Sequence, residues 1–302
     1  KRGYVTMNEE FYMNELIADQ NTQAEQPFDK ERWRQEKNQE KQEAYELIDT
    51  IASSVSNDDM LLSDYLLLSA RFPNLSAANI LLLLGQNPQA TELKGYNEWK
   101  ALGIYVKKGE QALLSIEKTS EYIRTSDGST ANNFAIKHLF DIAQTSAKQK
   151  VLEQIDQVAL IKSMIASSPV PITLSDEIPN DQKCYYDPVK GRILIARMTE
   201  KNEIFTALCN EIAHAKLGYQ NHHTYERDQN QSRAKCVTHI LANRYGFDHN
   251  FEEYDRLDMF SDCDTVIAKR DVLNELTRTA NSITYAIDKE QKSKDAAIKD
   301  AR

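Results

Sequence analysis

The chain has 302 residues, of which 41% are hydrophobic and 27% are charged, the balance of an ordinary globular protein. Its net charge of −9 argues against phosphate binding over the whole surface. No apolar run reaches the roughly 18 residues that would span a bilayer, so we expect no membrane partner.

The charge is unevenly distributed, which limits where a nucleic acid could bind. Residues 1–59 hold 7 Lys and Arg against 14 Asp and Glu, residues 60–146 hold 8 of each, and residues 147–302 hold 22 against 24. A nucleic-acid site would therefore be a local patch in the middle segment. The 4 cysteines show no CxxC spacing, which favours free thiols and a cytoplasmic location.

In the first half, the pattern predicts helices followed by strands. Residues 1–30 are polar and acidic, and we expect a flexible arm there. A helix is predicted over residues 30–55, a second after the cap cluster Ser56–Asp59, and a third from Ser76 to Gly85. Period-two patterns then predict one hairpin in "GIYVKKGEQALLSIEK" (103–118) and another around Asp127 and Gly128.

The second half is predicted to be mostly helical, with a small sheet. "PVPITL" (169–174) predicts a short strand, and "KCYYDPVKGRILIARM" (183–198) predicts a hairpin that turns at Pro188–Gly191. Apolar periodicity and end signals predict helices over residues 148–168, 199–217 and 228–245 and a long last helix from about Asp264.

An aromatic and basic cluster lies in the middle segment. A sequence-tolerant site for single strands needs aromatic faces for stacking and cations along the path of the backbone. The candidate residues, with amides that could bond bases or phosphates, are Asn79, Gln86, Asn87, Lys94, Tyr96, Trp99, Lys100, Tyr105, Lys107 and Lys108. The alternative interpretation is that Trp99 packs in the core and that the lysines only solvate a hairpin.

The sequence "CNEIAHAKLG" (209–218) contains an incomplete zinc-protease motif. In His-Glu-x-x-His, two histidines one helical turn apart hold the metal and the glutamate acts as general base. Glu211 and His214 take the places of the glutamate and the second histidine, whereas Asn210 stands where the first histidine would be. An amide oxygen is poorly suited to zinc beside imidazole, so Glu211 is interpreted as a vestigial base and His214 as a vestigial ligand.

Both halves resemble a known family. "AANILLLLGQ", "NPQATELKGYNEWKALGIYVKKGE" and "FDIAQT" (140–145) resemble the N-terminal domain of ArdC-type antirestriction proteins, which LtrC-like proteins of conjugative plasmids share. "YYDPVKGRILIA", "EIFTALCNEIAHAKLG", "AKCVTHILANRYGFD" and "RTANSITYAID" resemble the zincin-like metallopeptidase domain that follows it. The resemblance implies an α+β fold in which a domain that binds single-stranded DNA precedes a mostly helical, zincin-like domain with a small hairpin sheet.

The expected organisation is a flexible acidic arm (1–30), an ArdC-like domain (31–146), a degenerate metallopeptidase domain (147–290) and a charged tail (291–302). The resemblance implies an accessory or antirestriction protein of a conjugative plasmid or integrative element. Its expected partners are single-stranded DNA and a relaxase or another conjugation protein.

In the family, an acidic residue on the next helix supplies the third metal ligand, and aligning "ILANRYG" places Lys235 there. With this ligand and the first histidine both missing, we expect no metal cofactor and no catalysis. Lys235 would instead replace zinc as the local cation, pairing with Glu211 and with the Asn210 oxygen.

Two alternatives remain open. A rewired zinc site could use His214, Cys236 and His239, with His222 and His223 on the intervening loop, and would make the chain an active metallopeptidase. The chain could instead be a protein-interaction module that recruits relaxosome or restriction components through its acidic arm.

Overall fold

The computed structural model describes residues 29–126, 128–147, 155–179, 182–197, 201–220, 225–247 and 259–300. The chain forms two compact units, residues 1–42 and 43–302. In the first unit the structure describes the start of helix α2, where Asp29 Oδ1 accepts hydrogen bonds from the backbone N–H groups of Glu31 and Arg32. Of the arm expected over residues 1–30, residues 1–28 lie outside the described residues, and Lys30 is the first residue of α2.

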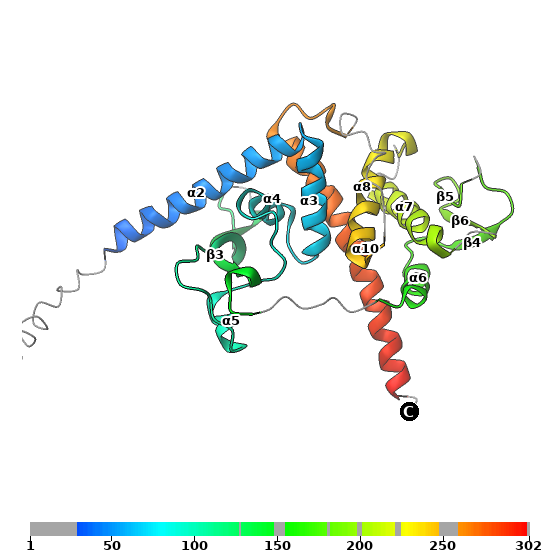
Figure 1. Cartoon of the computed structure of the whole chain (residues 1–302). Coiled ribbons are helices and arrows are strands. Elements are labelled where there is room, and N and C mark those ends of the chain that lie inside the picture. The colour runs from blue at the N-terminus through cyan, green and yellow to red at the C-terminus, as the bar shows by residue number, and fades with distance from the viewer. Residues whose placement is uncertain are drawn as a thin grey trace, which may run out of the picture. The chain divides into compact units, whose positions relative to one another are not determined.

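The elements follow the predicted order, helices first, then a sheet, then a second small sheet among helices (Figure 1). In chain order they are α2 (Lys30–Val55), α3 (Asp59–Arg71), α4 (Ala77–Gln86), β1 (Leu93–Lys94), α5 (Tyr96–Ala101), β2 (Leu113–Ile123), β3 (Thr130–Asp141), η1 (Ile142–Gln144), α6 (Gln157–Ala166), β4 (Ile172–Ser175), β5 (Cys184–Asp187), β6 (Arg192–Ala196), α7 (Lys201–Gln220), α8 (Arg227–Tyr245) and α10 (Val266–Asp300). The last helix therefore continues through most of the residues expected to form a tail.

Local side-chain chemistry sets several helix ends. Asp58 caps α3 by accepting from the backbone N–H groups of Met60 and Leu61, and Ser76 caps α4 by accepting from Asn79. Gly246 ends α8 with a φ of 71°, the left-handed conformation that favours glycine at this position. The boundaries predicted from these residues are confirmed.

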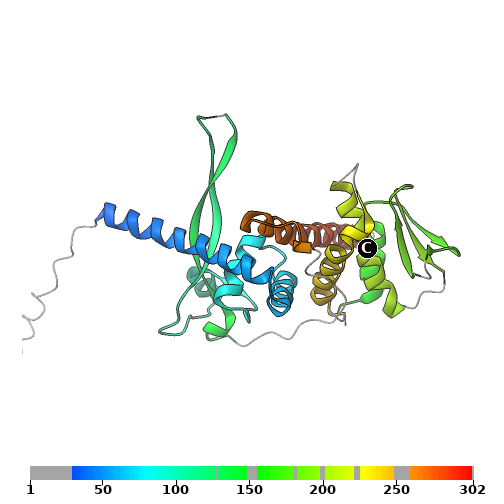
Figure 2. The ribbon, with the colours of Figure 1, turned by 90° about the horizontal axis from the view of Figure 1, so that it is seen from above.

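Of the two hairpins predicted in the first half, the one around Asp127 and Gly128 is confirmed, whereas the one over residues 103–118 does not form. Strands β2 and β3 pair antiparallel from Leu113↔Leu139 to Ile123↔Thr130, and β1 adds to the base of β3. Figure 2 shows the hairpin as a long twisted ribbon. Residues 103–112, expected to form a strand and a turn, contribute only the isolated bridge Val106↔Thr145. Gly103 and Gly109 both have positive φ, which interrupts an extended strand here.

The second sheet has the order β4-β6-β5, in which β4 runs parallel to β6 and β5 antiparallel to it. Its hairpin connects Asp187 to Arg192, as the Pro188–Gly191 signal predicted. The alternation of buried and half-buried residues along β5 directs Cys184 and Tyr186 toward the core. This places the backbone of β5 beside helix α7.

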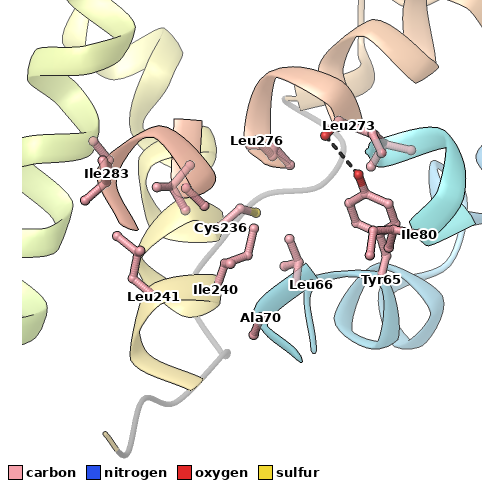
Figure 3. Close-up of a cluster of buried hydrophobic side chains, with 14 of the residues drawn as sticks. Tyr65, Leu66, Ala70, Ile80, Cys236, Ile240, Leu241, Leu273, Leu276 and Ile283 are labelled. Atoms are coloured by element: carbon pink, nitrogen blue, oxygen red, sulfur yellow. Dashed lines mark hydrogen bonds between the residues drawn. The ribbon is translucent and has the colours of Figure 1, made fainter. Parts of the chain in front are cut away.

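One hydrophobic core crosses residue 146, the boundary expected between two domains. Figure 3 shows Leu66 from α3 close to Ile240 from α8, with side chains of α10 beside them. The buried Tyr65 hydroxyl lies 3.0 Å from the backbone oxygen of Leu273 and 2.6 Å from Thr277 Oγ1, both on α10. Helices from both halves of the sequence are therefore packed together.

Arg244 joins three helices at the end of α3. From α8, its guanidinium donates to the backbone oxygens of Ser69 and Ala70 and to Asn281 Oδ1 on α10. Burial lowers the pKa of Arg244 to about 10, which leaves it charged at neutral pH. A cation at a helix C-terminus stabilises the carbonyl groups that the helix leaves unpaired.

Two further observations bear on the sequence predictions. The 4 cysteines are free, and Cys184, Cys209 and Cys236 are buried. Within the described residues, no helix is long and apolar enough to cross a membrane.

Candidate functional site

The incomplete protease motif lies on α7, where this helix packs against β5 and α8. Glu211 and His214 stand one turn apart and are almost fully buried, with 3% and 0% of their surface exposed. The apolar residues Phe205, Leu208 and Ile212 pack α7 into the core. A buried carboxylate and imidazole need partners, so their hydrogen bonds determine what this site can do.

The Glu211 carboxylate accepts four hydrogen bonds. Its Oε1 accepts from Asn210 Nδ2 at 3.0 Å and from Arg227 Nη2 at 2.7 Å. Its Oε2 accepts from the backbone N–H of Tyr186 at 2.6 Å and from Arg227 Nη1 at 2.8 Å. A carboxylate offers about four acceptor positions, so none remains for a water molecule.

Both nitrogens of His214 also have partners. Nδ1 contacts the hydroxyl of Tyr225, and Nε2 lies 3.1 Å from Gln231 Oε1. The Gln231 Oε1 can only accept a hydrogen bond, so Nε2 carries the ring proton and donates to it. The Tyr225 hydroxyl, whose pKa is raised by burial, therefore donates to Nδ1. Burial, reinforced by the charge of Arg227, lowers the pKa of His214 to about 4, so the ring is neutral.

The cation beside Glu211 is Arg227, which corrects the role that the sequence analysis gave to Lys235. Arg227 is the first residue of α8, and its guanidinium also lies 5.0 Å from the centroid of the Tyr185 ring. The α8 residue that contacts His214 is Gln231, one helical turn before Lys235. The partner of Glu211 thus lies in the first turn of α8, far along the helix from the "ILANRYG" sequence on which the prediction of Lys235 rests.

The rewired zinc site is also wrong, because its three residues are not brought together. Cys236 Sγ contacts Met259 Sδ at 3.7 Å, and His239 Nε2 lies 3.1 Å from Asn243 Nδ2. Across the part of the chain that the structure describes, no three His, Cys, Asp or Glu residues form a group that could hold a metal ion. His222 and His223 lie outside the described residues.

The residues of the α7 site do not fit a divalent metal. The His214 nitrogen nearest α8 already donates a proton, whereas a metal needs its lone pair. Glu211 is bound to a guanidinium, and Asn210 uses its Nδ2 as a donor to Glu211. The donor set is satisfied by protein groups alone, so we derive no chemistry through a metal.

The proposed nucleic-acid residues separate into an internal and an exposed group. Trp99 is 1% exposed, and its Nε1 donates to the backbone oxygen of Phe140 at 2.9 Å. The prediction that Trp99 stacks on bases is wrong, and the alternative that it packs in the core is confirmed. Lys94 pairs with Glu92, and its Nζ lies 4.5 Å from the centroid of the Trp99 ring.

The amide residues in the same list are occupied within the fold. Asn79 and Gln86 hydrogen-bond backbone groups of β2, and Asn87 Oδ1 accepts from the backbone N–H of Gln89 in a turn. These three side chains bond the protein backbone, and the DNA-binding surface proposed below does not include them.

The exposed group forms what we call the α5 face, defined as Tyr96, Lys100, Tyr105, Lys107 and Lys108. Tyr96 is 54% and Tyr105 is 61% exposed. The segment 140–146 anchors this face: Tyr96 packs edge-on against Phe140, the Tyr105 N–H donates to Ser146 Oγ, and Lys107 Nζ donates to the Ala143 oxygen. Two tyrosines and three lysines are thus held on one short segment.

A cleft of about 630 Å³ lies next to α5, and sequence reasoning missed it. Its walls include Arg71, Phe72, Lys94, Glu98, Leu102 and Lys137. Lys137 lies 3.8 Å from Glu98 and 3.6 Å from Glu117, so the cleft has mixed charge. Arg71 ends a helix and Lys137 lies within a strand, so only the tertiary fold brings them together.

The fold is of the α+β class, as predicted, and the incomplete His-Glu-x-x-His sequence lies on α7 beside β5 and α8. Two solved structures of the antirestriction protein ArdC from plasmid R388 have a similar fold. The Mn(II)-bound form has a TM-score of 0.50 and the metal-free form 0.48, each at 15% identity over 82% of this chain and 97% of ArdC. The expected ArdC-like fold is thereby confirmed. Neither a family model nor a curated protein matches the sequence.

Proposed function

We propose that the chain is an antirestriction protein of a plasmid or another conjugative element, that it binds single-stranded DNA, and that its metallopeptidase-like part does not catalyse. The similarity of fold to ArdC from plasmid R388 suggests the antirestriction role. The α5 face supports DNA binding. The observation that carries the loss of catalysis is the Glu211 carboxylate, whose acceptor positions are all occupied by protein donors.

The α5 face provides the two kinds of contact that a single strand needs. The exposed rings of Tyr96 and Tyr105 can stack on bases, a contact that tolerates any sequence. Lys100, Lys107 and Lys108 can neutralise phosphates and release counterions. Residues 60–146 carry no net charge, so we expect modest affinity that falls steeply as salt rises.

DNA binding is tested by fluorescence anisotropy on a labelled single strand and on the matching duplex over a salt series. The double variant Lys100→Ala/Lys108→Ala should weaken single-strand binding for every sequence. It should also reduce the slope of log affinity against log salt by about 1.4, two phosphate contacts at about 0.7 each. The control Lys162→Ala/Lys190→Ala removes the same charge from α6 and the β5–β6 turn and should change neither value.

The antirestriction role is tested by conjugation. A plasmid that carries the gene should transfer more efficiently into a restricting recipient than the same plasmid without it, with no difference in a non-restricting recipient. The Lys100→Ala/Lys108→Ala variant should lose this protection. Protection that persists without DNA binding would favour the protein-interaction alternative instead.

The loss of catalysis is tested with purified protein, denatured casein and added Zn²⁺ or Mn²⁺, with and without single-stranded DNA. Cleavage should not exceed that of Glu211→Gln, compared at a temperature where circular dichroism shows both proteins folded. Metal-dependent cleavage that only the wild-type protein performs would contradict the proposal.

A further inference from the structure

The pattern of bonds around Glu211 shows how three elements are joined where a metalloprotease would use its metal. We propose that Arg227 replaces the metal ion: its guanidinium is the cation that joins α7, α8 and β5, and it is the group that keeps a divalent metal out. The inference goes beyond the proposed function, because it does not depend on DNA binding or antirestriction.

The contacts of Arg227 link the three elements directly. From the first turn of α8 it reaches both Glu211 oxygens on α7, at 2.7 and 2.8 Å, in the planar two-point geometry that suits guanidinium and carboxylate. Its cationic centre lies 5.0 Å from the Tyr185 ring centroid on β5. Glu211 in turn accepts from the backbone N–H of Tyr186, also on β5. The guanidinium of Arg227 therefore joins α8, on which it lies, to both α7 and β5.

The two positions that lack metal ligands complete this arrangement. Asn210 donates its Nδ2 to Glu211, which a metal-bound imidazole could not do in the same orientation. Gln231 lies against His214 Nε2, the atom through which that histidine would bind a metal. A carboxylate at position 231 would therefore point to the place where such a metal would lie.

This geometry makes a specific conversion possible. A histidine at position 210 and a glutamate at position 231 would supply, with His214, three ligands on the two helices, the usual number for a catalytic zinc site. With Arg227 present, its positive charge beside Glu211 would still oppose a divalent ion. With Arg227 replaced by alanine as well, no positive charge beside Glu211 opposes the metal ion, and the space that the guanidinium fills is free.

The decisive experiment compares two variants that differ only at position 227. The triple variant Asn210→His/Arg227→Ala/Gln231→Glu should retain about one equivalent of zinc after dialysis, measured by elemental analysis, and zinc should raise its melting temperature. The double variant Asn210→His/Gln231→Glu, which keeps Arg227, should retain little zinc and show at least a tenfold weaker response. The proposal is overturned if the two variants retain equal amounts of zinc, or if the triple variant folds but retains no zinc.

A second measurement tests whether Arg227 holds α7, α8 and β5 together in the wild-type background, and it does not need the triple variant to fold. Arg227→Met should lower the melting temperature by about 5–15 °C, because it leaves a buried carboxylate unpaired. Arg227→Lys should lower the melting temperature less than Arg227→Met does, because lysine keeps the positive charge although it cannot form the two-point contact. The decrease in melting temperature of the double variant Arg227→Met/Glu211→Gln should be smaller than the sum of the decreases of the two single variants. Additive losses, or stoichiometric zinc on the wild-type protein that His214→Ala abolishes, would also overturn it.

Discussion

The side-chain amide of Asn79, on α4, hydrogen-bonds both backbone groups of Ile116, on β2. Nδ2 donates to the Ile116 oxygen at 2.9 Å, and Oδ1 accepts from the Ile116 N–H at 2.7 Å. Gln86 does the same for Leu114, at 3.1 and 2.7 Å. An amide side chain has the same donor and acceptor as a peptide group. The two residues therefore take the place of a neighbouring strand along the edge of β2.

Replacing Asn79 with alanine should destabilise the fold, because it leaves the Ile116 N–H and C=O without these partners in a partly buried place. We expect a loss of about 2–3 kcal/mol in the free energy of unfolding, measured by urea denaturation. Asn79→Asp should also lose stability, because its carboxylate faces the Ile116 carbonyl oxygen. Single-stranded-DNA affinity should be unchanged at a temperature where the variants are folded. An unchanged stability with lost DNA binding would return Asn79 to the nucleic-acid surface.

Local signals in the sequence predicted much of the fold. The caps Asp58 and Ser76, the end of α8 at Gly246 and the β5–β6 turn each depend on residues close together in the chain. The pairing of β2 was harder to predict, because residues 103–107 and 130–141 both offer alternating patterns. The choice depends on which partner completes the longer ladder, and that is a tertiary property.

The candidate site was predicted in part. The motif placed Glu211 and His214 together because they share a helix face. It could not identify Arg227, because the ion pair joins residues 16 apart across the segment between α7 and α8. Likewise, the sequence shows that Asn79 and Trp99 are polar or aromatic, but not that one bonds a strand and the other is buried. Long-range contacts decide each of these cases.

Gly85 allows α4 to pack closely against α2, and this predicts the effect of adding a methyl group. A Cβ at this position would lie 3.0 Å from Leu47 Cδ1 and 3.0 Å from Ile51 Cγ1. Alanine gains about 1 kcal/mol in helix propensity, whereas overpacking costs about 1–3 kcal/mol. Ile51 is β-branched and has little rotamer freedom to move away. We therefore expect Gly85→Ala to lower the free energy of unfolding by about 1 kcal/mol, measured by urea denaturation.

The comparison for Gly85 is a double-mutant cycle with Leu47→Ala, which removes one of the two crowded side chains. If the clash is the cause, the loss in the free energy of unfolding of the double variant should be smaller than the sum of the two single losses by about 1 kcal/mol. Strict additivity, or a gain in stability for Gly85→Ala alone, would show that α2 and α4 separate without cost.

His214 should make the stability of the protein depend on pH in a defined window. Burial, reinforced by the charge of Arg227, lowers its pKa from 6.5 to about 4 in the folded protein. Between these values the unfolded chain binds a proton that the folded protein does not, so stability must fall as the pH falls. The contribution is fully present above about pH 6.5 and is lost as the pH approaches 4. The shift corresponds to about 3 kcal/mol at most.

The measurement is the free energy of unfolding of the wild-type protein and of His214→Gln between pH 7.5 and 4.5, by urea denaturation. Glutamine cannot titrate, while the carboxylates and other histidines titrate in both proteins and cancel in the difference. The wild-type advantage should therefore shrink steadily below pH 6.5. Arg227→Met should reduce this pH dependence, because it removes a charge that opposes protonation of His214. A difference that stays flat, or that grows as the pH falls, would mean that the folded protein holds His214 protonated and that the hydrogen bond to Gln231 does not fix a neutral ring.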